Sequence, residues 1–299
     1  MEVFTNYHHL PLFKTPIALT IGSFDGLHLG HQKIFHTLKQ LKEKNSGSTI
    51  VITFSNHPVE ILKSITVPKI TPLEEKLALL KDFGVDTVIL LEFSQELQNL
   101  SYDTFIKELR KTIPFTHLIL GHGSTLGHNR EGNESRIKEL ANFLKFEAIY
   151  LEKACYEDTI ISSKTIREKL EFGDVETAKN LLGRPFAIYA PFHLEKLQET
   201  GEHRLKVTFD FQNHCTLPSG YYIVNLNADG FTSLASAYLT TLSMDKIHKT
   251  FDLEILIKGA TSPFMNDHIK IEFLRKIPSS KTFDEMIESS DKIKPLNLS

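Results

Sequence analysis

The sequence predicts an α/β protein in which a parallel sheet, covered by helices on both faces, is followed by a small antiparallel β-barrel or sandwich. Two observations support this fold class. Strand-like and helix-like segments alternate over residues 1–185, and repeated β-α order is typical of a parallel sheet. After Pro185 the helical spacing gives way to short strand candidates separated by turn residues. We therefore expect two domains, residues 1–185 and residues 186–299.

The expected elements of the first domain follow one another in a regular order. Apolar, mostly β-branched runs predict strands at 17–21, 49–54, 86–92, 117–120 and 147–151. Apolar residues recurring every three or four positions predict helices at 29–44, 73–83, 102–111 and 134–144. The second of these helices begins after Pro72 and ends at Gly84, as the preferences of proline and glycine favour.

The second domain shows short strand candidates instead of helices. Strands are expected at 188–190, 205–211, 221–227, 251–257 and 269–273. Turn signals at 218–220 and 229–230 separate some of them. A terminal helix is expected near 283–287, and the polar tail from Ser289 onward is expected to fray.

Size and composition exclude several classes of protein. The chain has 299 residues, which suits two domains of about 150 residues each. Hydrophobic residues make up 41% and charged residues 24%, so sizeable cores are expected and general disorder is excluded. The formal net charge of −3 lacks the basic excess usual in nucleic-acid-binding proteins, so no nucleic-acid partner is expected.

The cysteines and the N-terminal residues indicate the cellular compartment in which the protein is expected. Cys155 and Cys215 lack the spacing of a disulfide framework or a zinc site, so two reduced thiols are expected. Residues 1–14 show no signal peptide, and no apolar run approaches the roughly 20 residues that span a bilayer. We expect a cytoplasmic protein without a membrane partner.

The strongest candidate site is the stretch 20–33, where a strand enters a glycine-bearing turn and then a helix. This arrangement directs backbone N–H groups and the positive end of a helix dipole toward an anion. Gly22 lets a ligand approach the backbone closely. His28 and His31 are spaced to lie on one side of the helix entrance. Two imidazoles there can bind phosphate oxygens and stabilise the charge that develops as pyrophosphate leaves.

A second phosphate-binding helix start is predicted at 161–167. Ser162 and Ser163 are good N-cap residues for the helix that follows them. Arg167 lies in its first turns, where a guanidinium can pair with pyrophosphate through two hydrogen bonds.

These motifs resemble those of a known family. Residues 23–31 resemble the HxGH nucleotidyltransferase signature in the form found in bacterial bifunctional riboflavin kinase/FMN adenylyltransferases, the prokaryotic FAD synthetases. The family's other segments are matched, in order, by the His-Pro turn in 51–58, the helix-strand segment 75–86, the flavin loop 120–132, the ISSTxIR-like motif 161–167 and the segment 171–185. The resemblance covers nearly all of 15–186. It implies a Rossmann-like nucleotidyltransferase domain followed by a riboflavin-kinase-like β-barrel.

The resemblance also implies a reaction, the transfer of AMP from ATP to FMN with release of pyrophosphate, with Mg²⁺ accompanying ATP. It implies that His28, His31 and Arg167 are catalytic. The residues implied to bind nucleotide or flavin are Gly22, Ser23, Phe24, Asp25, Gly30, Lys33, His57, Gly121, Ser162, Ser163 and Lys164. A monomer or weak homo-oligomer is expected.

Two departures from the family pattern concern the first domain. The flavin loop of the family reads GxDFxFG or GxNFxFG, whereas Gly123, Ser124 and Leu126 replace its polar and aromatic residues here. Lys164 replaces the threonine of ISSTxIR. The loop leaves two alternatives open, namely a nucleotidyltransferase for another acceptor and a non-catalytic binding protein.

A third departure concerns the kinase module. The family's PTAN motif, which binds Mg²⁺ and nucleotide phosphate, is missing between Phe186 and Leu217. Glu254 matches the strand that bears the catalytic glutamate, so it is a possible kinase base. We expect a β-barrel whose kinase activity is lost or much reduced, and the full bifunctional enzyme is the alternative.

Overall fold

A computed structural model describes residues 1–8, 10–191, 193–196, 203–210, 214–228, 231–241, 250–257 and 268–278. The chain divides into two compact units, one formed by 1–67 with 73–162 and the other by 68–72 with 163–299. The α/β fold class predicted from the sequence is confirmed. The boundary at residue 185 between two functional domains stays a prediction.

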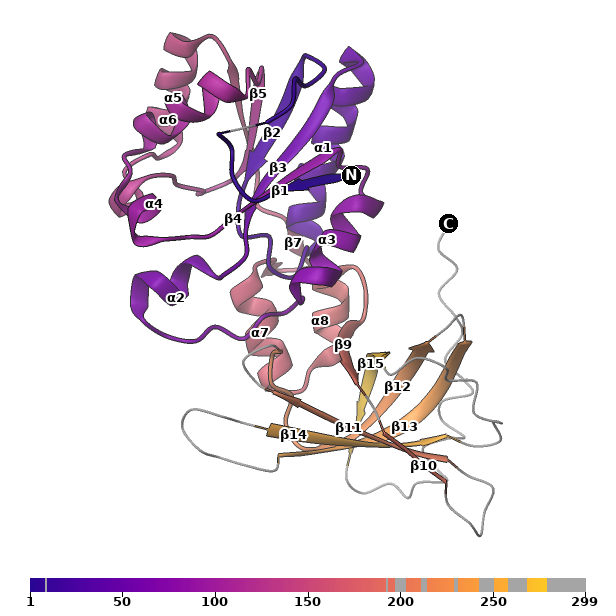
Figure 1. The fold of residues 1–299 in the computed structure, drawn as a ribbon. Helices are drawn as coiled ribbons and strands as arrows, with labels where there is room; N and C mark the ends of the chain where they lie inside the picture. The colour runs from indigo at the N-terminus through magenta and orange to yellow at the C-terminus, as the bar shows by residue number, and fades with distance from the viewer. Residues whose placement is uncertain are drawn as a thin grey trace. The chain divides into compact units, whose positions relative to one another are not determined.

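The first unit contains a six-stranded parallel sheet with the strand order β1-β4-β3-β2-β5-β6 (Figure 1). Its strands are β1 (Glu2–Phe4), β2 (Ile17–Ile21), β3 (Ser48–Phe54), β4 (Thr87–Leu91), β5 (His117–Gly121) and β6 (Glu147–Leu151). Five of them confirm predicted strands. A short hairpin of β7 (Cys155–Tyr156) and β8 (Thr159–Ile160) follows the sheet.

The helices of the first unit alternate with these strands. They are α1 (Leu29–Asn45), α2 (Pro58–Lys63), α3 (Leu73–Asp82), α4 (Gln95–Asn99), α5 (Tyr102–Thr112), α6 (Glu134–Leu144) and a 3₁₀ turn, His128–Arg130. The four predicted helices are confirmed as α1, α3, α5 and α6. None of the helices in the described ranges has both the length and the apolar character needed to cross a membrane.

Strand alternation assigns the helices to two faces. Ile17 and Leu19 of β2 join a buried cluster with Phe105 of α5 and Ile137 of α6. The residue between them, Ala18, joins a second cluster that includes side chains of α1 and α3. Successive strand side chains point to opposite faces, so both faces of the sheet are covered, as predicted (Figure 1).

The second unit contains two helices and an antiparallel sheet. The helices are α7 (Ser163–Glu171) and α8 (Val175–Leu182). The sheet has the order β10-β11-β14-β13-β12-β15-β9. Its strands are β9 (Phe186–Pro191), β10 (His193–Lys196), β11 (His203–Asp210), β12 (Gly220–Ala228), β13 (Phe231–Thr241), β14 (Thr250–Ile257) and β15 (His268–Ile277). β9, at one end of this order, also lies close to β11 near the other end, so the sheet curls round as a small barrel does.

The sequence missed two strands of this sheet, β10 and β13. The predicted turn at 229–230, the terminal helix near 283–287 and the tail from 289 lie outside the described residues.

Candidate functional site

The topology of the parallel sheet indicates where a ligand binds. β2 lies between β3 and β5, and both neighbours run parallel to it. The chain goes from β2 to β3 on one side and reaches β5 on the other side only later. In open parallel sheets, ligands bind outside the carboxyl ends of the strands at this reversal of direction. The turn at Gly22 and the loop at Gly121 leave β2 and β5 at this edge, so the fold brings two predicted site segments together.

The turn between β2 and α1 has an unusual backbone. Phe24 and Leu27 have positive φ angles of 48° and 37°, although they are only 3% and 0% exposed. Residues with side chains rarely adopt this region, and such strain is typical of ligand-binding segments that their surroundings hold in place. A Cβ atom at Gly22 would lie 2.9 Å from the Phe24 ring, so the turn requires glycine there.

His28 and His31 form a stacked pair at the start of α1. Their ring centroids are 3.6 Å apart, with an angle of 18° between the planes. His28 is the N-cap residue, and its Nδ1 accepts a hydrogen bond from the backbone N–H of His31 at 3.3 Å. Because Nδ1 is the acceptor, the proton of a neutral His28 ring is on Nε2. The predicted placement of both imidazoles on one side of the helix entrance is thus confirmed.

The surroundings of this pair suit an anion. The first turn of α1 contains no acidic residue, so the positive end of the helix dipole is not offset there by a carboxylate of that turn. The edge of the Phe24 ring meets the His31 ring, with centroids 5.2 Å apart. A Cβ atom at Gly30 would lie 3.1 Å from the ring of His28, so glycine leaves room for the imidazole.

A buried lysine that was not predicted as a site residue reaches the same turn. Lys76, in the first turn of α3, is 7% exposed. Its Nζ lies 3.4 Å from the carbonyl oxygen of Ser23. A signal was present in the sequence, because Lys76 falls on the same helical face as the apolar residues Leu73 and Leu80.

The other predicted residues of the first unit have varied surroundings. Asp25 is 5% exposed within the turn, and Lys33 lies on α1. His57 is the N-cap residue of α2 and accepts the N–H of Val59 at 3.2 Å. Glu60 completes this capping box by accepting the N–H of His57 at 3.0 Å. His57 therefore has a structural role, and its contact with nucleotide stays a prediction.

The loop after β5 is folded back on itself. Leu126 and Gly132 exchange two backbone hydrogen bonds, of 3.1 and 2.9 Å. The side chain of Leu126 is partly buried against the core cluster on the α5 and α6 face. The residue at one of the family's aromatic positions thus contributes to the protein core. Gly121, the last residue of β5, begins the loop.

The second predicted motif is the stretch 161–167. Its residues from Ser163 onward belong to the second unit, whereas Ser162 is the last residue of the first unit. Helix α7 begins at Ser163, so Ser162 directly precedes it. The Nε of Arg167 donates a hydrogen bond to the carbonyl oxygen of Pro68 at 3.0 Å. Lys164 is 86% exposed at its side chain and forms an ion pair of 3.7 Å with Glu168.

Further hydrogen bonds join the segment 68–72 to the rest of the second unit. The backbone N–H of Cys215 donates to the carbonyl oxygen of Lys69 at 3.0 Å. Arg184 donates to the hydroxyl of Thr71 at 2.9 Å. The partner that orients Arg167 is therefore itself held in place.

The possible kinase base lies in the middle of the antiparallel sheet. Glu254 is on β14, where it is paired with Lys206 of β11 and with Tyr238 of β13. As to metals, no cluster of three or more His, Cys, Asp or Glu suited to an ion occurs in the described part of the chain.

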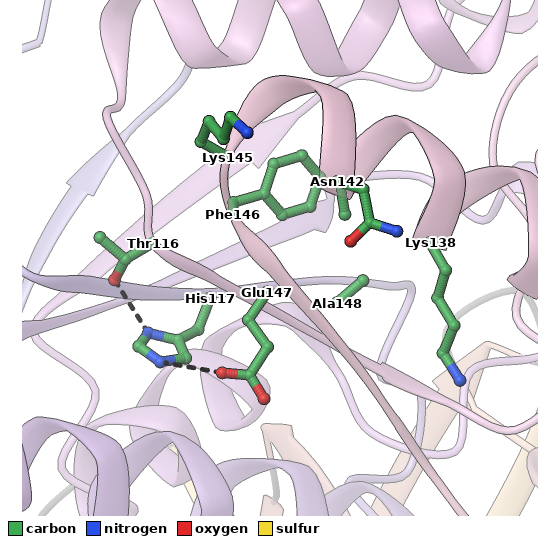
Figure 2. Close-up of a pocket in the computed structure, with 9 residues that line it drawn as sticks. Thr116, His117, Lys138, Asn142, Lys145, Phe146, Glu147 and Ala148 are labelled. Carbon is green, nitrogen blue, oxygen red and sulfur yellow. Dashed lines mark hydrogen bonds and ion pairs between the residues drawn. The ribbon is translucent and has the colours of Figure 1, made fainter.

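A pocket of about 670 Å³ lies beside α6, away from His28 and His31 (Figure 2). His117 and Glu147, at the starts of β5 and β6, line it together with residues of α6. Nδ1 of His117 lies 2.8 Å from the hydroxyl oxygen of Thr116, and Nε2 lies 3.6 Å from a carboxylate oxygen of Glu147. Figure 2 marks both contacts with dashed lines. The amino ends of the strands are opposite the edge that carries His28, so this pocket is not part of the candidate site.

The chain is similar to known enzymes of flavin nucleotide synthesis. A family model described as "FAD synthetase" matches residues 11–165. A bifunctional riboflavin kinase/FMN adenylyltransferase of Buchnera aphidicola subsp. Schizaphis graminum is 34% identical over 191 residues, which are 63% of this chain and 61% of the relative. The chain thus matches about three fifths of that relative. The Bacillus subtilis protein of the same name is 29% identical over 298 residues, covering 97% of this chain and 93% of the relative.

A solved structure is similar over most of its length. The crystal structure of a macrolide-efflux protein from Streptococcus pneumoniae gives a TM-score of 0.76 and covers 93% of both chains. At 20% sequence identity this similarity shows a shared fold alone.

Proposed function

Because the chain belongs to the FAD synthetase family, we propose that it transfers AMP from ATP to FMN, forming FAD and releasing pyrophosphate. The observation that carries this proposal is the stacked pair of His28 and His31 at the N-terminus of α1. The pair lies at the sheet edge where parallel α/β sheets bind their ligands. Helix N–H groups and imidazole N–H groups are suitable donors for phosphate oxygens.

The proposed reaction needs positioning and charge stabilisation more than covalent chemistry. A phosphate oxygen of FMN attacks the α-phosphorus of ATP in line, a new P–O bond forms, and the bond to the β-phosphate breaks. The Nε2–H of His28 and the ring of His31 stabilise the negative charge on the α-phosphate and the leaving group. Arg167 holds the β- and γ-phosphates. Mg²⁺ enters with ATP and neutralises part of the phosphate charge.

The loop 121–132 is the proposed place of the flavin. Its lack of aromatic residues at Ser124 and Leu126 predicts weaker stacking on the isoalloxazine ring than in the family pattern. FMN binding is therefore expected to be weak, and an acceptor other than FMN is the main alternative within the same reaction class.

One incubation series tests the proposal. The purified chain is given ATP and Mg²⁺ with either FMN or riboflavin, and the products are separated by chromatography. FAD from FMN, abolished in His31→Ala, supports the proposal. Pyrophosphate release that needs another phosphorylated acceptor indicates a changed substrate. ATP binding without any pyrophosphate release indicates a non-catalytic binding protein.

A second activity, phosphorylation of riboflavin, has one specific observation in its favour. The Bacillus subtilis relative, whose name includes riboflavin kinase, matches 97% of this chain. Against it stands the missing PTAN motif, since a base without its phosphate and metal clamp contributes little to phosphoryl transfer. We therefore expect little or no FMN from riboflavin. FMN formation by the wild-type chain that Glu254→Gln abolishes would establish the full bifunctional enzyme.

A further inference from the structure

We propose that Lys76 is a positioning residue for the His28–His31 pair, because it fixes the turn that connects β2 to these imidazoles. The inference rests on the proposed function, since it assigns Lys76 a part in the same site. Lys76 is 7% exposed on α3, and its side chain points to the carboxyl edge of the sheet, where β2 and β3 end.

The ammonium group of Lys76 donates to acceptors on three residues of the strand ends and the turn. Its Nζ lies 2.9 Å from the carbonyl oxygen of Phe54, 3.3 Å from Oγ1 of Thr53 and 3.4 Å from the carbonyl oxygen of Ser23. Thr53 is fully buried and donates its hydroxyl to the same Ser23 oxygen at 3.2 Å. One carbonyl of the turn is thus held by two donors from other elements.

Holding the Ser23 carbonyl sets the conformation of the next residue. That carbonyl belongs to the peptide that joins Ser23 to Phe24, so its direction constrains the φ angle of Phe24, which is +48°. An L-residue gains about 1–2 kcal/mol by leaving this left-handed region. The charge-assisted hydrogen bond from Lys76 opposes that relaxation, because it favours the peptide orientation that the strained backbone requires.

The effect reaches the imidazoles through packed rings. Phe24 is 3% exposed, and its ring meets His31 edge-on at an interplanar angle of 85°. His31 in turn stacks on His28. A shift of the Phe24 backbone must therefore displace one or both imidazoles. Misplacement of catalytic groups by about 1 Å costs on the order of 10²-fold in rate.

The use of a lysine at this position needs an explanation. Burying an ammonium group is costly, and an apolar side chain fills the space under a sheet edge without that cost. A purely structural tie between α3 and β3 would require only the bond to Phe54. The additional bond to Ser23, across to the turn after β2, is what a positioning role requires.

The test compares Lys76→Met with Lys42→Met in the full-length chain. Methionine keeps the length of lysine and removes its charge and donors. Lys42 is a matched control, because it too joins separate segments, through Asp86 and the carbonyl oxygen of Gly84, but at the other end of α1. The measurements are the imidazole NMR signals of His28 and His31 without ligands, kcat and KM for pyrophosphate release, and the melting temperature.

Lys76→Met is expected to shift both imidazole signals and to lower kcat by about 10- to 100-fold, with KM values within about threefold of wild type. Lys76→Arg is expected to recover part of kcat. Lys42→Met is expected to lower the melting temperature and to leave the imidazole signals and kcat unchanged. The proposal is overturned if Lys76→Met behaves like Lys42→Met.

Two provisions keep the outcomes separable. If Lys76→Met does not fold, Thr53→Val removes the second donor to Ser23 and is expected to shift the same imidazole signals by a smaller amount. Unchanged signals in that variant overturn the proposal. If the wild-type chain makes no FAD, the proposed function fails, whereas the imidazole signals of the ligand-free protein still decide whether Lys76 positions the pair.

Discussion

The backbone N–H of His31 donates to Nδ1 of His28 at 3.3 Å, so His28 caps the N-terminus of α1 while its ring stacks on the ring of His31. The same imidazole therefore has two duties. Its Nδ1 satisfies one of the N–H groups that every helix start leaves without a partner, and its Nε2 retains the proton. Helix stability and phosphate binding thus depend on different nitrogen atoms of His28.

Substitutions at His28 separate these duties. Asparagine is among the best N-cap residues, whereas alanine cannot cap. We expect His28→Ala to lose about 1 kcal/mol of stability and His28→Asn to lose little, while both lower FAD formation by about 10²-fold or more. Urea unfolding and an FAD assay on the two purified variants check this. Activity retained in His28→Asn would show that capping is the only duty of this residue.

Replacing either of two glycines in the loop after β5 by alanine is expected to lower the free energy of unfolding, but by different amounts. Gly123 and Gly127 have nearly equal φ angles, +73° and +77°. A Cβ atom at Gly127 would lie 2.2 Å from the backbone nitrogen of Tyr102, whereas one at Gly123 meets nothing within 4 Å.

Gly123→Ala is therefore expected to cost about 1–2 kcal/mol, from the left-handed backbone alone. Gly127→Ala is expected to cost about 3 kcal/mol or more, because the Tyr102 backbone must also move. Thermal or urea unfolding measures both. Equal losses in the two variants would contradict the packing of this loop against Tyr102.

The sequence predicted the parts of the fold that bury continuous apolar runs. All five residues of β2 are buried, and a run of this kind is typical of a central parallel strand. β1 was missed because it has three residues and is mostly exposed. β13 was missed because its sequence, FTSLASAYLTT, is rich in small and polar residues. Its strand conformation depends on pairing with β12 and β14, which only the tertiary structure supplies.

The candidate site was predicted in outline only. The spacing of His28 and His31 indicated one helix face, but it did not indicate that Nδ1 of His28 caps the helix. Lys76 lies on the apolar face of its helix, which was a signal of burial, but no local pattern shows that its ammonium group reaches the turn at Ser23. The bond between Arg167 and Pro68 joins residues 99 positions apart, so no local pattern reports it.

The carboxylate of Asp86 makes stability depend on pH. Burial alone would raise the pKa of Asp86, but hydrogen bonds from Lys42 and Thr49 outweigh burial and hold this pKa below its ordinary value. A carboxylate with a lowered pKa in the folded state stabilises the protein above its unfolded-state pKa of about 3.9. That contribution is lost as the pH falls through the folded-state pKa.

Asp86→Asn is therefore expected to lower the melting temperature by about 2–6 °C near pH 7, corresponding to about 1–2 kcal/mol for a partly exposed group. The difference from wild type is expected to shrink below about pH 4. Melting curves between pH 7 and pH 3 measure it, with Lys42→Met expected to show the same trend. A difference that stays constant over this range would show that the charge of Asp86 does not contribute.

The bond from Arg167 to Pro68 predicts that lysine cannot replace this arginine. Nε of Arg167 donates to the Pro68 carbonyl at 3.0 Å, and a guanidinium group has two other nitrogen atoms that donate in the same plane. A lysine has a single ammonium group, which cannot both hold the carbonyl and grip two phosphate oxygens in a fixed geometry. We expect Arg167→Lys to raise the KM for ATP about tenfold or more while the melting temperature changes little.

Arg275→Lys is a suitable control, because Arg275 also donates through Nε, at 3.1 Å to Glu176, on an exposed surface. Steady-state kinetics of pyrophosphate release on both variants measures the difference, and an unchanged KM for ATP in Arg167→Lys would remove Arg167 from the proposed phosphate site.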